Sequence, residues 1–475
     1  MNALINQTAR GRLWRGLSVM LCGTLIAGCG GGGSEGGGST AANANNAETS
    51  VMQVGAAPVS VAAPASVVQT LAVPQALAQT PFDEPRNLLV PPGFGIRVWA
   101  RVPKARFMAV APNGDVLVSV PSAGKIVLLR NRPNDTPQQF DFAGDMHNPH
   151  DMVFHQIGDI TYLYVAESNR ITRSVYSAGD ITTAAREIII DNLPDNSTPE
   201  LRGSYGHELK NIALSPDHRL FVSIASTCNA CIEDTNSDPV RGAIYEYSAD
   251  GKNPRLFSRG LRNAEGLAFL PGTTTLWVTV NNRDEVRVPT DADVDGDGQS
   301  DRGKLVPSFV DENPPELFTS LRDGGNYGWP YCNSVPNASM STLDVMPDYE
   351  LNRDNSFFNC AVADRVAKGL RAHSAPLGFS FLHASNMPIA YRSGAAIAQH
   401  GCWNCTSLRA GYKVSYFPFD AIGNAGAEID LVTGFVTNPD ERTFWGRPVD
   451  VVPDINGNLL ISDDYADAIY QLYPL

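Results

Sequence analysis

Short apolar runs broken by turn residues fill most of the chain, and residues 203–227 show this pattern most clearly. An apolar strand at 211–215 is followed by a Pro-Asp pair and then by a second strand at 219–226. Apolar residues that alternate with polar ones between turn residues predict a β-hairpin rather than a helix. His207 stands just before the first strand, where a loop would open onto one end of a sheet.

The same order of strand, turn and strand recurs in six units that follow one isolated strand at residues 91–103. The units cover residues 107–129, 150–177, 203–261, 265–286, 375–420 and 447–475. About four short strands in every 40 to 70 residues are typical of propeller blades. We therefore predict an all-β fold, a six-bladed β-propeller, in which the isolated strand joins the last unit and removes the open edges. A β-sandwich fits this number of similar repeats poorly, and no long helix is evident.

Residues 1–28 have the pattern of an export signal, in which three arginines precede an apolar run at residues 17–28. The run ends in I-A-G-C, which resembles the lipobox of bacterial lipoproteins and implies that Cys29 is lipidated and begins the mature chain. An ordinary signal peptide or a short membrane anchor is the alternative, although the run is short for a transmembrane helix.

Residues 29–80 are rich in Gly and then in Ala, Val, Gln and Pro, a composition that predicts a disordered tether. Residues 81–475 would form the propeller domain. A lipid, a tether and a folded body predict a protein of the bacterial cell envelope that contacts the membrane through its lipid only. The net charge of −14 argues against nucleic acid as a partner, because phosphates require clustered Lys and Arg.

Six of the eight cysteines lie in the propeller region, an even number that favours disulfides in an oxidising compartment. Their spacing predicts two tight loops and one longer bridge. The pairs would be Cys228 with Cys231, Cys402 with Cys405, and Cys332 with Cys360. The two C-x-x-C pairs also permit a zinc site or a redox pair. Attachment of c-type haem is excluded because no His follows either pair.

An acidic insertion at residues 291–301, DADVDGDGQSD, resembles the calcium loops of the D-x-D-x-D-G kind. Oxygen ligands at alternating positions can converge on one ion, while glycine permits the sharp turn. The candidate ligands are Asp293, Asp295, Asp297 and Asp301. Position twelve of such a loop is Lys rather than Glu here, so a solvated acidic loop is the alternative.

Basic and polar side chains recur at the loop end of several units. GHELKN contains His207, GLRNAEGLAF contains Arg262 and Asn263, QHGCWNCTSLRAGYK contains Arg409, and GRPVDV contains Arg447. Together with DGGNYGWPYC and NLLISDDYADAIY, these motifs resemble the glucose/sorbosone dehydrogenase family, and most closely its sorbosone dehydrogenase branch. The resemblance extends from about residue 85 to the end of the chain.

The resemblance implies oxidation of an aldose or a related sugar with pyrroloquinoline quinone (PQQ) and calcium. His207 aligns with the family's general base, a task that suits an imidazole. Asn263 aligns with the amide donor to the quinone oxygen. Arg262, Arg409 and Arg447 fall at positions that bind the carboxylates of PQQ, which guanidinium groups match well. Electrons would pass to a membrane quinone or a cytochrome.

Three positions depart from the family pattern. Ser226 stands where soluble glucose dehydrogenases carry an acidic residue that orients the histidine, so the orientation must be achieved otherwise. Arg409 replaces the family's Lys near the quinone, and HGSWNR is changed to HGCWNC. Two other functions stay open. One is a metal-dependent, lactonase-like hydrolase with Glu, Asn and Asp ligands, and the other is a non-catalytic propeller that binds glycans or proteins.

Overall fold

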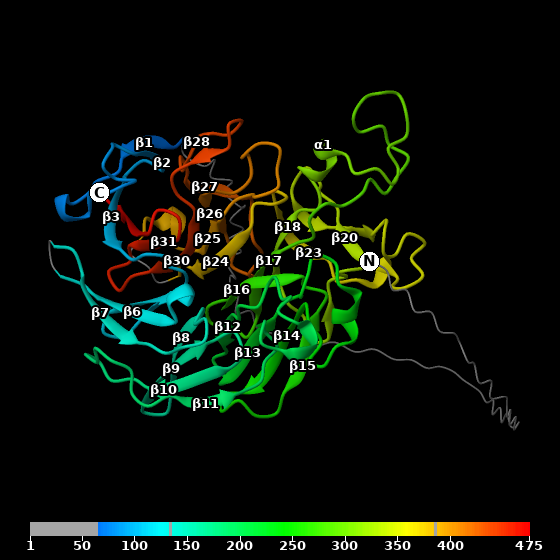
Figure 1. Ribbon diagram of the computed structural model, residues 1–475. Helices are drawn as coiled ribbons and strands as arrows, with labels where there is room; N and C mark the ends of the chain where they lie inside the picture. Colours follow the sequence, from blue (N-terminus) through cyan, green and yellow to red (C-terminus); the bar gives the residue numbers. More distant parts are fainter. Residues whose placement is uncertain (1–64, 133–134, 384–386) are drawn as a thin grey trace, which may run out of the picture. The chain divides into compact units, whose positions relative to one another are not determined.

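Six sheets of mainly antiparallel strands stand around a common axis in the computed structural model, which describes residues 65–132, 135–383 and 387–475 (Figure 1). From the axis outward, the first three blades are β4 (Met108–Val110), β5 (Val116–Val120), β6 (Lys125–Arg130) and β7 (Gln138–Ala143); β8 (Met152–Ile157), β9 (Ile160–Ala166), β10 (Ile171–Val175) and β11 (Glu187–Ile190); and β12 (Ile212–Leu214), β13 (Arg219–Ile224), β14 (Ala243–Ser248) and β15 (Arg255–Arg259).

The remaining three blades complete the ring. They are β16 (Asn263–Phe269), β17 (Leu276–Asn281), β18 (Glu316–Ser320), β23 (Val366–Leu370) and β21 (Ser341–Leu343); β24 (Pro376–Phe381), β25 (Gly394–Gln399), β26 (Lys413–Pro418) and β27 (Ile429–Val432); and β30 (Pro448–Pro453), β31 (Leu459–Asp463), β32 (Ala468–Pro474) and β3 (Phe94–Arg101). The predicted six-bladed, nearly all-β propeller is thus confirmed. In the described part of the chain, the single α-helix, α1 (Pro307–Val310), has four residues.

The second strand of each blade explains why the repeats fold this way. Every residue of β5 and of β25 is buried, because neighbouring blades pack on both faces of the sheet. Strands covered on both faces are mostly apolar, and these contain only one polar residue each, Ser119 in β5 and Gln399 in β25. The hairpin between β4 and β5 turns at Asn113-Gly114, where Gly114 has φ 86°, a backbone angle that favours glycine.

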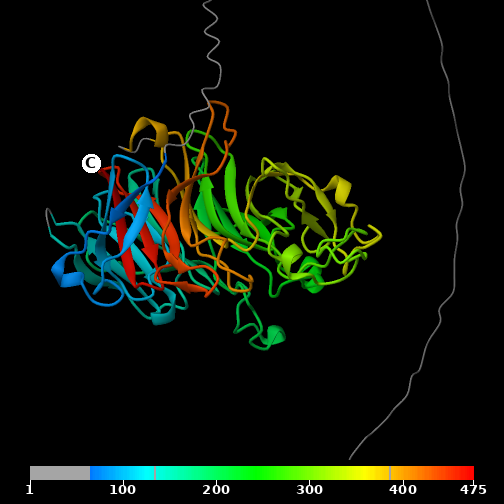
Figure 2. The same cartoon turned by 90° about the horizontal axis from the view of Figure 1, so that it is seen from above.

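The isolated N-terminal strand closes the ring, as predicted. β3 pairs antiparallel with β32 from Phe94↔Pro474 to Arg101↔Ala468. In both Figure 1 and Figure 2 the blue β3 lies beside the red strands of the last blade. A strand from the start of the propeller therefore completes the last blade through a hydrogen-bonded ladder that covers the outer edge of β32.

The folded region begins earlier than residue 81, the boundary predicted from composition. β1 (Val67–Thr70) pairs with β2 (Asn87–Val90), and Leu71 and Leu77 are buried in the core beneath the last two blades. These apolar residues lie in a segment rich in Ala, Gln and Pro, whose average composition concealed them. The predicted export signal and Cys29 lie outside the described residues.

Buried side chains near the axis connect one blade to the next. The Asp151 carboxylate accepts hydrogen bonds from the amides of Met152 (2.7 Å) and Ile212 (2.9 Å), and so connects the second and third blades. The Asp450 carboxylate accepts the Met108 amide at 2.8 Å and connects the last blade to the first. Burial raises the pKa of Asp151 to about 8 and that of Asp450 to about 7.

All three predicted disulfides are present. They join Cys228 to Cys231, Cys332 to Cys360, and Cys402 to Cys405. Because these six sulfurs are bonded in pairs, a zinc site at the C-x-x-C pairs would lack its thiolate ligands. The two short loops lie directly after β13 and β25, so they occupy equivalent places in the third and fifth blades.

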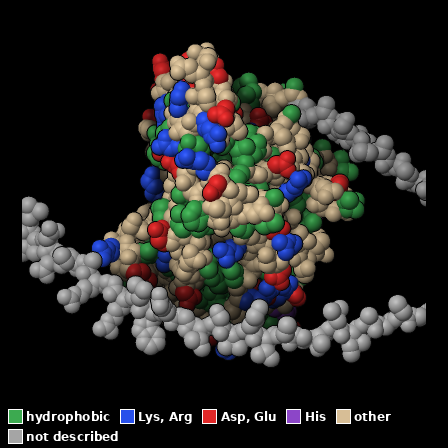
Figure 3. All heavy atoms as spheres, turned by 90° about the vertical axis from the view of Figure 1, so that its right-hand side faces the viewer, with side chains coloured by type: hydrophobic (Ala, Val, Ile, Leu, Met, Phe, Trp, Pro, Cys, Tyr) green, Lys and Arg blue, Asp and Glu red, His purple; other side chains and the backbone are tan. Residues whose placement is uncertain are grey.

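The surface carries charges of both signs. On the face in Figure 3, Lys and Arg side chains are interspersed with Asp and Glu side chains. Within residues 65–475, the described helices are all too short to cross a bilayer.

We expect the ring closure to contribute strongly to stability. Ile96 on β3 is 2% exposed in the core, so Ile96→Ala should lower the free energy of unfolding by about 2–5 kcal/mol. Val68→Ala, at a position that is 64% exposed on β1, should change it by less than about 0.5 kcal/mol. Denaturant unfolding of both variants measures this, and an equal effect of the two would contradict the closure.

Candidate functional site

The loops of the third, fourth and fifth blades surround a cavity of about 210 Å³ at one end of the propeller. His207 precedes β12, Arg262 precedes β16 and Asn263 begins it; the remaining residues end or follow β17, begin β18, precede β24 or follow β25. The lining is His207, Arg262, Asn263, Asn281, Asn282, Asp284, Glu316, His373, Ala375 and Trp403. The structure thus brings together three of the five predicted catalytic and cofactor-binding residues.

The orientation of His207 is set by Ser226. The ring Nδ1 lies 2.9 Å from the Ser226 carbonyl oxygen and 3.0 Å from its Oγ. A carbonyl oxygen only accepts, so the neutral ring carries its proton on Nδ1 and leaves Nε2 as a proton acceptor. Burial and then the charge of Arg262 lower the pKa of His207 to about 4. Ser226 therefore orients the histidine, the task expected of an acidic residue at this position.

Arg262 is a buried cation held by a partly buried anion. Its Nη2 lies 3.0 Å from Oδ2 of Asp284, and its Nε donates to the Asn229 carbonyl at 3.2 Å. The side chain of Arg262 is 7% exposed and that of Asp284 is 17% exposed. Burial opposes ionisation of Asp284, but its bond with His373 and the charge of Arg262 hold its pKa below the ordinary value.

Each C-x-x-C disulfide loop supplies one asparagine to Asp284. In the loop Cys228–Cys231, the Asn229 side chain donates to the Asp284 carbonyl at 2.9 Å and accepts its amide at 2.8 Å. In the loop Cys402–Cys405, the Asn404 amide nitrogen donates to Oδ1 of Asp284 at 3.3 Å. Two cross-linked loops from different blades therefore hold Asp284 in place, one through its backbone and one through its carboxylate.

A second histidine and a second carboxyl group complete the floor of the cavity. His373 lies 3.2 Å from Oδ1 of Asp284 through Nδ1, and its Nε2 donates to the Val310 carbonyl at 2.6 Å. Burial opposes its charged form, yet the bond with Asp284 raises the pKa of His373. Glu316 accepts the Asn282 amide, and burial raises the pKa of Glu316 to about 7.

Two asparagines place amide groups at the cavity. Asn263 donates through Nδ2 to Oε1 of Glu265 at 2.8 Å, a bond that fixes the plane of its amide. Asn281 has a buried Oδ1 without a hydrogen-bond partner in the described part of the chain. An orphaned acceptor in a polar cavity favours a bound cation or donor group there.

Arg409 and Arg447 do not line this cavity. Arg409 is half-exposed, pairs with Asp440 at 2.8 Å, and borders a separate hollow beside Cys405. Arg447 donates to the carbonyl oxygens of His400 (3.0 Å) and Gly401 (3.1 Å). It supports the loop after β25, and its assignment to the cofactor stays a prediction, as does that of Arg409.

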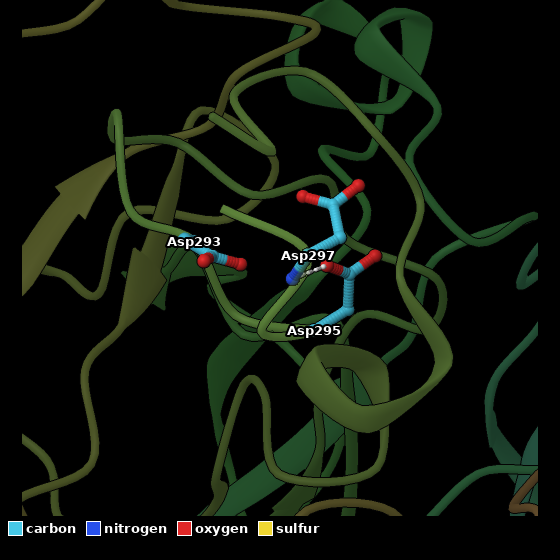
Figure 4. Close-up of side chains that lie close together, drawn as sticks. All are labelled: Asp293, Asp295 and Asp297. Atoms are coloured by element: carbon cyan, nitrogen blue, oxygen red, sulfur yellow. Dashed lines mark hydrogen bonds between the residues drawn. The ribbon is translucent and has the colours of Figure 1, made fainter. Parts of the chain in front are cut away.

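The acidic loop gathers three of its four predicted ligands. Carboxylate oxygens of Asp293, Asp295 and Asp297 lie within 4.8 Å of one another, and all three side chains are exposed (Figure 4). Asp301 does not join them, because its carboxylate accepts the amides of Val294 and Asp295 and pairs with a lysine. The loop precedes α1 and is separate from the lining of the cavity, and its calcium site stays a prediction.

Four cavity residues escaped the motif analysis: Asn281, Asn282, Asp284 and His373. The first three belong to a polar run, NNRD, directly after the strand of the fourth unit, at the same point of the blade as Ser226 in the third. This equivalence between the two units is the sequence signal that could have identified the run as part of the site. His373 begins the loop HSAPLG, which the sequence assigns to the pocket only as a whole, because a single histidine in an irregular loop has no period or spacing to reveal its own role.

The model of the TrAA12-like family matches residues 88–474, nearly all of the propeller. The chain belongs to the TrAA12-like family. The family-level placement predicted from the motifs is thereby confirmed. A match of this extent covers all six blades, and so every loop that contributes to the cavity.

Solved structures share the fold of this TrAA12-like chain. The holo form of the pyranose dehydrogenase PQQ domain from Coprinopsis cinerea is 18% identical with a TM-score of 0.67, over 81% of this chain and 96% of that one. A calcium structure of family AA12 from Trichoderma reesei is 18% identical with a TM-score of 0.67, over 82% of this chain and 97% of that one. The apo form of the soluble aldose sugar dehydrogenase from Escherichia coli is 14% identical with a TM-score of 0.51, over 80% of this chain and 100% of that one.

We expect the acidic loop to bind calcium with a dissociation constant on the order of 10⁻⁴ M, as exposed extracellular sites do. Asp295→Asn should abolish this binding, because it removes one of three converging charges, whereas Asp159→Asn, at an exposed carboxylate in another turn, should not. Calorimetric titration of calcium into protein without PQQ measures both. Binding that is unchanged in Asp295→Asn would exclude the loop as the site.

Proposed function

We propose that the protein is a PQQ-dependent sugar dehydrogenase that oxidises an aldose or a related sugar. The observation that carries this proposal is the pairing of a neutral base with a buried cation in one cavity, His207 with Arg262. The family supports it, as do the names of the Coprinopsis cinerea domain and the Escherichia coli enzyme, which refer to PQQ and to aldose sugars.

His207 is the proposed general base. Its Nε2 is unprotonated because Nδ1 donates to Ser226, and the low pKa keeps the ring neutral at physiological pH. A sugar hydroxyl that donates to Nε2 passes its proton there as the carbon is oxidised. The product carries one proton and one hydride less than the substrate, which converts a hemiacetal into a lactone.

The residues of the cavity fit a quinone cofactor that carries carboxylates. PQQ, when bound, supplies the hydride acceptor. Arg262 would hold one of its carboxylates, and the amide of Asn263, whose plane Glu265 fixes, would donate to a quinone oxygen. The lining also contains the anion Asp284 and the carboxyl group of Glu316, so Arg262 alone does not balance three carboxylates.

A calcium ion beside the cofactor would supply the missing positive charge. The orphaned Oδ1 of Asn281 and the carboxyl group of Glu316 are oxygen ligands of the kind that calcium prefers. We propose that calcium in this family member serves the cofactor cavity, independently of the exposed acidic loop.

The cellular setting extends the proposal. We propose that Cys29 carries a lipid that anchors the protein at the cell envelope, on the outer membrane or the periplasmic face. A membrane quinone or a cytochrome would then collect the electrons from the cofactor. Membrane contact would be confined to the lipid.

A second candidate is a metal-dependent lactonase, and one observation favours it. Glu316, Asn282 and Asp284 line the same cavity, and these residue types form the metal sites of hydrolytic propellers. In this protein, however, Asp284 is committed to Arg262 and His373, and the Asn282 amide is committed to the Pro315 carbonyl at 3.0 Å. The dehydrogenase accounts for the buried arginine, which a hydrolytic metal site does not require.

PQQ titration in the presence of calcium, followed by dye-coupled oxidation of an aldose panel, tests the function. We expect binding with turnover, and a loss of roughly 10²–10⁴-fold in kcat in His207→Gln with little change in PQQ affinity. His218→Gln, at a histidine in the turn between β12 and β13, should retain full activity. Failure to bind PQQ, with cleavage of lactones by the same protein, would establish the hydrolase instead.

The pH dependence of kcat/KM should reveal the low pKa of His207. The base acts only when neutral, so activity should persist from pH 7 to about pH 5 and fall as the pH approaches the value of about 4. An unperturbed imidazole would already lose half of its activity near pH 6.5. Arg262 favours the neutral ring, whereas Asp284 favours the charged one. A half-maximal point near pH 6.5 would contradict the assignment.

A further inference from the structure

Trp403 differs from the other tryptophans in the described part of the chain. Its side chain is 69% exposed, whereas Trp99, Trp277, Trp329 and Trp445 are between 3% and 5% exposed. A large aromatic surface in water is unfavourable unless a ligand covers it. Trp403 also lines the cavity of His207, in which Arg262, Glu316 and His373 are buried, so its indole stands at the rim.

The loop that carries Trp403 is held firmly despite this exposure. The disulfide Cys402–Cys405 closes it, and the Tyr412 hydroxyl donates to the Cys402 carbonyl at 2.9 Å. The Arg442 guanidinium donates to the carbonyl oxygens of Cys405 and of Trp403 itself, the latter at 2.5 Å. An exposed indole on a cross-linked loop loses little conformational freedom when a ligand binds.

The same loop is tied to the chemistry of the cavity. Asn404, the residue after Trp403, donates to Asp284, which in turn pairs with Arg262 and with His373. The position of the indole relative to His207 is therefore set by the contacts that set the cavity. A substrate ring that rests on Trp403 would be held in a defined position relative to the base.

We propose that Trp403 forms a stacking subsite for the ring of the sugar at the entrance of the cavity. This inference rests on the proposed function and deepens it. A pyranose ring presents C–H groups on its faces and hydroxyl groups around its edge. A flat indole matches the C–H face, while the polar groups of the cavity match the hydroxyl groups. The subsite favours rings without axial hydroxyl groups on the stacked face.

The subsite predicts a particular kinetic signature. Trp403→Ala should raise KM for the preferred aldose about tenfold or more and leave kcat within about twofold, because the indole binds the ring and does not touch the reacting atoms. The KM of Trp403→Phe should lie between those of the wild type and Trp403→Ala, since the smaller phenyl ring keeps part of the stacking surface. The preference between sugars that differ in one axial hydroxyl group should shrink in Trp403→Ala.

A matched control is available in a second disulfide loop. Phe357 is 71% exposed and lies between Cys332 and Cys360, outside the lining of the cavity. Phe357→Ala should leave KM and kcat unchanged. The double variant Cys402→Ser/Cys405→Ser should raise KM less than Trp403→Ala does, because it frees the loop but keeps the indole.

The closing experiment combines steady-state kinetics of the PQQ-loaded protein with protection of tryptophan fluorescence from acrylamide by sugars. A raised KM in Trp403→Ala at nearly constant kcat supports the subsite, and an unchanged KM overturns it. If the wild-type protein oxidises no sugar, the proposed dehydrogenase fails, and the fluorescence then decides. Protection by aldoses that disappears in Trp403→Ala supports the subsite, and no protection in the wild type overturns it.

Discussion

The candidate site depends on one buried ion pair, that of Asp284 with Arg262. A carboxylate in this position is costly unless its oxygens are satisfied, and here Arg262, His373 and Asn404 share them. The guanidinium group, held in this way, disfavours a charge on His207. Asp284 thus fixes the position of Arg262, and through it the charge state of His207.

The propeller explains how such an arrangement can be built from distant segments. The loops of three blades meet at one end because each blade repeats the same strand order about the axis, and the β3–β32 ladder closes that ring. Two short disulfide loops, Cys228–Cys231 and Cys402–Cys405, then bring an asparagine each to Asp284. Fold and cross-links together restrict loops that would otherwise be mobile.

Much of this was predictable from the sequence, because strand alternation and turn residues are local signals. The six blades and the closing strand followed from them, the three disulfides followed from the spacing of the cysteines, and the family motifs brought His207 and Arg262 to one site. Asp284 was missed because its role consists of contacts between loops from different blades. Arg409 was expected near the cofactor, a role that stays a prediction, and its guanidinium pairs with Asp440 beside a separate hollow. Charge alone does not specify where a long side chain points.

The central claim is that His207 is a neutral imidazole with its proton on Nδ1 and a free Nε2. Nitrogen NMR of ¹⁵N-histidine-labelled protein, with His207→Gln to assign the signal, measures this directly. We expect an unprotonated Nε2 at about pH 6 and a titration midpoint well below the ordinary imidazole value of about 6.5. A His207 that is doubly protonated at pH 6, or that carries its proton on Nε2, would contradict it.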